Sequence, residues 1–324
     1  MSSAICTLFE GHYHFGLAAF TNSLYAQGYR GNLYAGYRGE LPSWASTAEL
    51  NPSLAWKNSK TMKLGDGLFL HFLPLETDYH FSNFKPDFMM QLWDGPEKDT
   101  DNLYYFDPDI IVMRPWALFE EWVSCGVAVS EDINSPLAEY NPRRVAWRRY
   151  YGEKGIDLKF KDSIYVNSGF LGLNKKDRNF LELWKKIQET VAPLLGGLNR
   201  SIFTNEHLAL LDKVGGPFSP FVKTDQDALN AALEATDKNI SFLGKDGMGF
   251  EGGLILMYHA LGCDKPWKWK PYKMLLKGVP PRRVDVEYWN SVASPISIAS
   301  KNEIFFSKLS LKICTAVGRF YQRN

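Results

Sequence analysis

The sequence predicts one α/β domain followed by a helical tail, because short apolar strand patterns alternate with amphipathic helical patterns. The chain opens with a βαβ unit: a strand over 4–9, a helix over 15–27 and a strand over 31–37. Ligands of such sheets bind beyond the carboxyl ends of the strands, so we expect the loop Glu10–His14 at a binding edge. This loop carries neither GxGxxG nor GxxxxGK[ST], which argues against a dinucleotide fold and a P-loop.

The remaining predicted elements continue this alternation. Strands are expected over 67–72, 103–106, 110–113, 125–130, 163–173 and 254–258, and helices over 83–93, 115–122, 176–195, 224–234 and 302–324. Two segments fit less clearly. Residues 51–63 are polar and are interpreted as a loop or short helix, and residues 141–155 are basic and are interpreted as a solvated helix or a mobile segment.

Composition narrows the class of protein. The 324 residues are 45% hydrophobic with a net charge of +1, so a sizeable core is expected and nucleic acid is excluded as the main partner. The four cysteines, Cys6, Cys125, Cys263 and Cys314, form no CxxC pair, which predicts a reducing compartment without structural zinc. No signal peptide is visible, and no apolar run reaches the roughly 18–20 residues that span a bilayer. We therefore expect a cytoplasmic protein, soluble or peripheral at the membrane surface.

Two carboxylates stand between two apolar strand patterns, in the segment Phe106-Asp107-Pro108-Asp109-Ile110. Burying carboxylates is unfavourable unless a cation or dense hydrogen bonding compensates, and the proline stiffens the turn. A hard divalent metal carrying a phosphate would suit this turn. From these residues alone, an Asx-Pro turn without a metal is an equal alternative.

Three other segments place polar residues at element ends. Lys85 stands near a helix N-terminus, where it could meet an anionic ligand or stay solvated. The segment Asn167–Gly169 interrupts a strand, which suggests a bulge or the close approach of a ligand. Thr224 is a predicted N-cap, and the first turn after it is filled by carboxylates and an amide. Capping explains only part of that turn.

The final predicted helix is amphipathic. Its apolar stripe consists of Phe306, Leu309, Ile313, Val317 and Phe320, flanked by Lys308, Lys312, Arg319 and Arg323. Packing of the stripe onto the rest of the chain is the simpler interpretation. The alternative is contact with an anionic membrane surface.

Taken together, four segments resemble the signature set of family 8 glycosyltransferases. They are Phe106–Asp109, Tyr165–Gly169, Asp225–Asn230 and His259–Trp267. The family consists of retaining, metal-dependent enzymes and includes glycogenin and bacterial lipopolysaccharide galactosyltransferases. The resemblance implies a GT-A (Rossmann-like) fold with a central mixed, mostly parallel sheet flanked by helices. We expect a catalytic domain over 1–285, followed by a helical, basic tail over 286–324.

The resemblance also implies a metal and diphosphate site. Asp107, Asp109 and His259 match the ligands of Mn²⁺ (or Mg²⁺), and Asp107 also matches a contact to the donor. Lys265 matches the lysine that neutralises the donor diphosphate. Gly262 matches the glycine whose backbone approaches that diphosphate.

The donor sugar and nucleotide are assigned in the same way. Asn167 matches a residue near the sugar, and Asp225 and Gln226 match the catalytic acidic–amide pair beneath the anomeric carbon. Lys85 fills a basic position near the nucleotide, where Thr7 and Phe9 are also expected. The loop Thr7–Tyr13 lacks the family's Asn-Tyr-Ala pattern around uracil, so the base is less firmly assigned than the metal site.

The predicted activity is transfer of a hexose from a nucleotide-diphosphate sugar, a UDP-sugar, to a glycan, lipid-linked or protein acceptor. Acceptor contacts are expected from the loops 134–155 and 196–220. The route to retention stays open between double displacement and front-face attack, and a homo-oligomer is neither predicted nor excluded. The alternatives are a nucleotidyltransferase, disfavoured by the missing glycine-rich basic loop, and a non-catalytic binding protein on a transferase scaffold.

Overall fold

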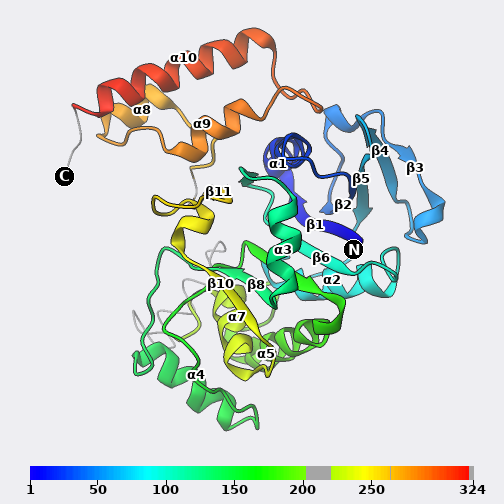
Figure 1. The fold of residues 1–324 in the computed structure, drawn as a ribbon, viewed down its shortest axis with the longest axis vertical. Helices are drawn as coiled ribbons and strands as arrows, with labels where there is room; N and C mark the ends of the chain where they lie inside the picture. Colours follow the sequence, from blue (N-terminus) through cyan, green and yellow to red (C-terminus); the bar gives the residue numbers. More distant parts are fainter. Residues whose placement is uncertain (202–219, 263, 321–324) are drawn as a thin grey trace.

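The computed structural model describes residues 1–201, 220–262 and 264–320. A nine-stranded mixed sheet runs through the molecule in the order β10-β8-β9-β6-β1-β2-β5-β4-β3 (Figure 1). Its strands are β1 Ser3–Glu10, β2 Gly31–Arg38, β3 Glu49–Leu50, β4 Lys60–Leu64, β5 Leu68–Pro74, β6 Asn102–Phe106, β8 Val127–Ser130, β9 Phe170–Asn174 and β10 Ile240–Leu243.

Strand direction brings several chain segments to one edge of the sheet. The central strands β5, β2, β1 and β6 are parallel, whereas β4 and β9 run against their neighbours. The carboxyl ends of β1, β6 and β8 therefore share an edge with the amino end of β9. This arrangement confirms the predicted mixed, mostly parallel sheet flanked by helices. Ligands of open α/β sheets bind at this edge.

Helices cover both faces of the sheet, because side chains along each strand alternate between two cores. Along β1, Ala4, Cys6 and Leu8 enter one core, and Ile5 and Phe9 enter the other. The first core is covered by α2 Lys85–Asp94, α4 Pro142–Gly152, α5 Asn179–Leu195 and α7 Thr224–Ala235. The second is covered by α1 His14–Ala26 and α3 Ala117–Ser124.

A small second sheet joins distant parts of the chain. Strand β7, Ile110–Val112, pairs antiparallel with β11, Met257–His259, and His259 lies directly opposite Ile110. The described residues also form several 3-10 helices: η1 Gly11–Tyr13, η2 Ser43–Ala45, η3 Pro52–Leu54, η4 Phe81–Asn83, η5 Lys175–Asp177 and η7 Lys245–Met248.

The C-terminal part forms a helical layer beside β11 (Figure 1). It consists of α8 Pro271–Leu276, α9 Arg283–Asn290 and α10 Lys301–Gly318, and α10 packs on the other two. The expected domain limit at residue 285 falls inside α9, and the two-part division stays a prediction. Within the described ranges, no helix is both long and apolar enough to cross a bilayer.

Three sequence interpretations need correction, and one was incomplete. Helix α4 is not simply solvated, because Arg144, Trp147 and Tyr151 form a buried face that its basic composition masked. Thr224 is not the N-cap of α7: the cap position is Lys223, whose N–H is accepted by the Asp227 carboxylate at 2.8 Å. The segment 51–63 contains η3 but also the start of β4.

The apolar stripe of α10 is exposed rather than packed on the part of the protein that the structure describes. Its predicted members are 42% to 92% exposed, and the buried residues of the helix are Leu311, Cys314 and Gly318. Periodicity identifies an apolar face but does not determine what covers it. Cys263, Arg323 and most of the predicted acceptor loop 196–220 lie outside the described residues.

Candidate functional site

A cavity of about 440 Å³ opens at the sheet edge where β1, β6, β8 and β9 meet. Ten of the eleven residues predicted at the site line it: Phe9, Lys85, Asp107, Asp109, Asn167, Asp225, Gln226, His259, Gly262 and Lys265. Thr7 is the exception. It is fully buried within β1 and precedes the residues at the carboxyl end of this strand that line the cavity.

Asp107, Asp109 and His259 form a compact group of potential metal ligands. One ligand atom from each lies within 4.8 Å of the others. Asp107 and Asp109 occupy the turn between β6 and β7, and the pairing of β11 with β7 carries His259 to the same place. The His259 Nε2 atom lies 3.3 Å from Asp109 Oδ1 and 3.7 Å from Asp107 Oδ2. Two carboxylates and one imidazole form a donor set that suits Mn²⁺, so these residues fit the predicted metal.

Lys265 supplies positive charge to this group. Its ammonium donates to Asp109 Oδ2 and, at 2.7 Å, to the Ala260 carbonyl. Burial alone would raise the pKa of Asp109, but the Lys265 ammonium and His259 outweigh it and hold that pKa well below its usual range. Asp109 is therefore an ionised carboxylate at neutral pH.

Gly169 makes room for the ligands. A Cβ atom at this position would lie 2.5 Å from His259 Cε1 and 3.0 Å from Asp107 Oδ2. The Gly169 carbonyl accepts the Asp107 N–H at 2.7 Å, and its own N–H donates to Asn167 Oδ1 at 2.8 Å. The polar interruption seen in the sequence is thus a close approach, made by the side chains of His259, Asn167 and Asp107.

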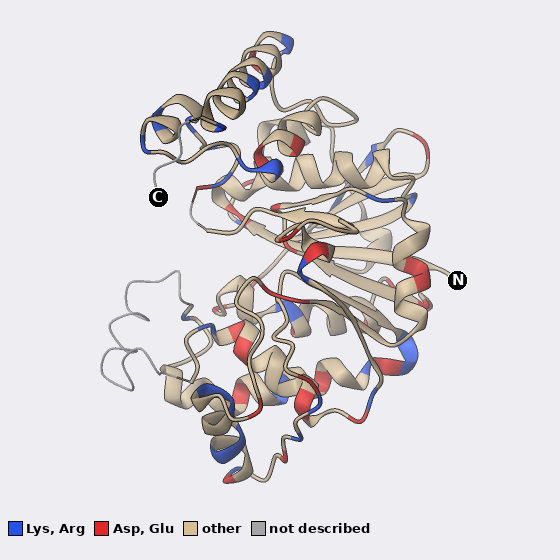
Figure 2. Cartoon of the chain, turned by 60° about the vertical axis from the view of Figure 1, so that its left-hand side comes forward, with Lys and Arg blue, Asp and Glu red and all other residues tan. Residues whose placement is uncertain are grey.

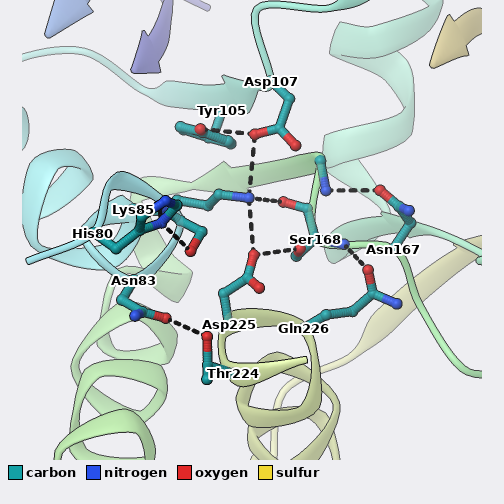
Figure 3. A network of polar contacts seen from close by, with 12 residues as sticks. His80, Asn83, Lys85, Tyr105, Asp107, Asn167, Ser168, Thr224, Asp225 and Gln226 are labelled. Atoms are coloured by element: carbon teal, nitrogen blue, oxygen red, sulfur yellow. Dashed lines mark hydrogen bonds and ion pairs between the residues drawn. The ribbon is translucent and has the colours of Figure 1, made fainter. Parts of the chain in front are cut away.

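Lys85 connects the metal-ligand turn to helix α7 (Figure 3). Its ammonium donates to the Ser168 carbonyl at 2.9 Å and to Asp225 Oδ2 at 3.1 Å, and it lies 3.2 Å from Asp107 Oδ1. Burial would lower the pKa of Lys85, but the carboxylates of Asp107 and Asp225 more than offset this and raise it. Its side chain is only 3% exposed, so Lys85 is an internal tie rather than a solvated cation.

The first turn of α7 faces the same network. Asp225 also accepts a hydrogen bond from Ser168 Oγ at 2.7 Å. Burial would raise the pKa of Asp225, but Lys85 and these hydrogen bonds lower it overall. The neighbouring Gln226 accepts from the Ser168 N–H at 3.4 Å, while its buried Nε2 has no hydrogen-bond partner in the described structure. Thr224 donates to Asn83 Oδ1, which links α7 to η4.

Sequence reasoning missed several residues of the cavity wall. Asp132 is 1% exposed and accepts a hydrogen bond from Asn167 Nδ2 at 2.6 Å. Tyr105 donates to Asp107 Oδ1 at 2.9 Å, and Ser168 was quoted only as part of a motif. Asp132 could have been found, because it follows the apolar strand β8 as Asp107 follows β6, and both strands end at the same edge.

The side of the cavity near β1 is aromatic. Phe9 lies with its ring stacked on Tyr37, at 5.9 Å between centroids. Tyr13 follows in η1, and the Lys265 ammonium lies 5.6 Å from the centre of its ring. Gly262 has a φ of +81° and open space where a Cβ would be, so its backbone is accessible to a ligand.

Comparison with known proteins supports the fold. No protein-family model matches the chain, and no curated protein is similar to it in sequence. The apo structure of the bifunctional glycosyltransferase WbbM has a TM-score of 0.50 and 14% identity, and the match covers 95% of this chain and 52% of WbbM. The galactosyltransferase LgtC, solved with donor and acceptor sugar analogs, has a TM-score of 0.42 and 16% identity, covering 82% of this chain and 89% of LgtC.

The chain has the GT-A fold. It spans about half the length of WbbM, and at this identity the likeness concerns the fold alone. Membership of family 8 stays a prediction.

Proposed function

We propose that the protein is a metal-dependent, retaining glycosyltransferase that moves a hexose from a UDP-sugar to a hydroxyl group of a glycan, lipid-linked or protein acceptor. The observation that carries this proposal is the joint placement of Asp107, Asp109 and His259 beside Lys265, in one cavity at the ligand-binding edge of a GT-A fold. The similarity of its fold to the glycosyltransferase WbbM supports glycosyl transfer as the class of reaction.

The part of the cavity formed by the candidate metal ligands and Lys265 would receive the diphosphate. Asp107, Asp109 and His259 would hold Mn²⁺ or Mg²⁺, and the bound metal would neutralise charge that develops on the leaving diphosphate. Lys265 adds a second positive charge beside them, and the exposed backbone at Gly262 allows close approach of the phosphates. The ion pair with Lys85 keeps the Asp107 carboxylate in place.

The part of the cavity wall formed by the first turn of α7 and by Asn167 would hold the donor sugar. The unpartnered Gln226 Nε2 is a buried donor on the cavity wall, which is what a sugar hydroxyl or ring oxygen requires. Asp225 and Asn167 lie beside it at the same wall. In the reaction, the bond from the anomeric carbon to the diphosphate breaks, a bond to the acceptor oxygen forms, and the proton of the acceptor hydroxyl passes to the departing diphosphate.

The proposal is tested with a panel of UDP- and GDP-hexoses in the presence of Mn²⁺, scored for release of the nucleoside diphosphate. We expect UDP release from a UDP-hexose, dependent on metal. Asp109→Ala should lower the rate about 100-fold or more, because it removes a metal ligand and the partner of Lys265.

Asp99→Ala is the matched control, since Asp99 is an exposed carboxylate outside the cavity. Full activity of a folded Asp109→Ala variant would refute the metal role. Release of GDP would correct only the base, whereas pyrophosphate as the product would indicate a nucleotidyltransferase.

A further inference from the structure

Helix α10 exposes the apolar side of its surface to solvent. It packs on α8 and α9 through Leu311, Cys314 and Gly318, and Gly318 leaves room for Pro280. At 100° per residue, the apolar stripe lies on the opposite side of the helix. The stripe, named here the α10 apolar face, consists of Phe305, Phe306, Leu309, Ile313 and Val317 of the helix and Phe320 in the turn after it, each at least 42% exposed.

This orientation reverses what is usual for a helix of a globular protein. Such helices bury their apolar stripe and expose their polar side. The α10 apolar face extends from Phe305 to Phe320. Exposed apolar residues that occur singly need no explanation, whereas a continuous row of them indicates a binding surface. The neighbouring α8 also exposes Tyr272 and Leu276, at 52% and 76%.

Cations border the α10 apolar face on one flank. Lys301, Lys308, Lys312 and Arg319 fall between the buried and the apolar sides of the helix, on the same side of its axis. Figure 2 shows Lys and Arg along this helix at the top of the view. A helix with aromatic and aliphatic residues on one side and Lys and Arg beside them is typical of helices that lie in a membrane interface.

Charge is unevenly divided along the chain. Residues 268–324 contain eleven Lys and Arg and three Asp and Glu, a net charge of +8. Because the whole chain has a net charge of +1, residues 1–267 carry −7. The positive pole therefore coincides with the helical layer that exposes the apolar face. An anionic lipid surface complements both properties at once.

We propose that the α10 apolar face docks on an anionic lipid bilayer, with α10 lying along its surface. The proposal does not depend on the transferase activity. It does place the cavity near the bilayer, since α8 starts at Pro271, only six positions after Lys265, a span of at most roughly 20 Å.

The test is co-sedimentation of the full chain with vesicles of phosphatidylcholine alone, or of an equal mixture of phosphatidylcholine and phosphatidylglycerol. We expect binding to the anionic vesicles only, weakening as salt is added. Phe306→Glu combined with Ile313→Glu should lower the partition coefficient about 100-fold. Lys308→Glu combined with Lys312→Glu should lower it at least about tenfold and reduce its salt dependence.

Leu50→Glu is the matched control, because Leu50 is 66% exposed on β3, away from the helical layer. Thermal unfolding of each variant verifies the fold. The proposal is wrong if the protein binds neither vesicle, binds both equally, or loses binding equally in Leu50→Glu. Concentration-dependent dimers that Phe306→Glu/Ile313→Glu abolishes, without vesicle binding, would instead assign the α10 apolar face to a second copy of the chain.

Discussion

At the scale of single residues, the candidate site depends on a glycine, Gly169, because a larger residue would not fit there. Gly169 stands where His259, Asp107 and Asn167 converge, and any Cβ there would overlap two of them. The same residue fixes Asp107 by accepting its N–H. Gly169 is therefore a positioning residue for the proposed metal ligands, although it offers no ligand atom itself.

Gly169→Ala should weaken Mn²⁺ binding about 10- to 100-fold, because the added methyl group displaces the His259 ring. In other metal sites, changing a residue that orients a ligand lowers the affinity by a similar factor. Calorimetry measures the affinity, and circular dichroism verifies the fold. Gly172→Ala is the control. Gly172 lies in β9, and its Cβ would meet Tyr104 of β6 and Ala128 of β8, so the change should alter stability but leave Mn²⁺ affinity unchanged. Equal affinity in Gly169→Ala would contradict the positioning role.

The sequence, through its residue types, their order and the resemblance they carry to family 8 glycosyltransferases, was enough to nominate Asp107, Asp109 and His259 as candidate metal ligands. It did not allow their environment to be predicted. Lys85 is enclosed by two carboxylates and the Ser168 carbonyl, which come from three separate elements. Local patterns contain no information about such long-range convergence, and this is also why Asp132 was overlooked.

At the scale of elements, α4 anchors the first turn of α7. The Asp227 carboxylate accepts hydrogen bonds from Tyr165 at 2.6 Å and from Arg143 at 2.7 Å. It also accepts the Lys223 N–H. These bonds hold the turn that presents Asp225 to the cavity. The basic segment that the sequence suggested to be solvated is thus part of the support of the site.

Asp227→Asn should destabilise the protein by about 1.5–3 kcal/mol, because it weakens hydrogen bonds to a buried charge. Urea unfolding measures this free energy. Glu234→Gln is the matched comparison: Glu234 lies in the same helix, 3.2 Å from Arg144 Nε, but its carboxylate makes no hydrogen bond within the described structure. If Glu234→Gln lowered the free energy of unfolding more than Asp227→Asn does, hydrogen bonding to Asp227 would not be the source of the stabilisation.

Elements were predicted well where the segment is strongly buried, as in β1 and α1, or where one buried face gives a clear period, as in α5. They were missed where burial is weak. Strand β10 is only partly buried throughout, and β3 has two exposed residues, so neither has a marked alternation. For α10 the helix was right and its orientation wrong, since an apolar stripe is compatible with a core or with an outside partner.

At the scale of the whole molecule, the proposed metal site closes a long loop. His259 reaches Asp107 and Asp109 only after β11 has paired with β7, a contact between segments far apart in the sequence. Contacts of this kind bring a large loop-closure entropy and form late in folding. A metal held there would stabilise the native state more than the transition state.

Saturating Mn²⁺ should therefore slow unfolding in urea and leave the refolding rate almost unchanged, measured by mixing kinetics with and without metal. The Asp109→Ala variant should show no effect of Mn²⁺ on either rate. Faster refolding with unchanged unfolding would mean that the ligands come together early.

The reversed direction of β9 has a consequence for how substrate choice can change during evolution. Because β9 runs against β8, the chain leaves β8 and enters β9 at the cavity edge. The segment 131–169 between them, which includes α4, is therefore a connection with both ends fixed at the rim. Insertions there would reshape the rim without shifting the register of any strand, and each doubling of a loop adds only about 0.6 kcal/mol of closure entropy. New acceptors can thus be accommodated by loop length alone, while the groups on the cavity floor stay in place.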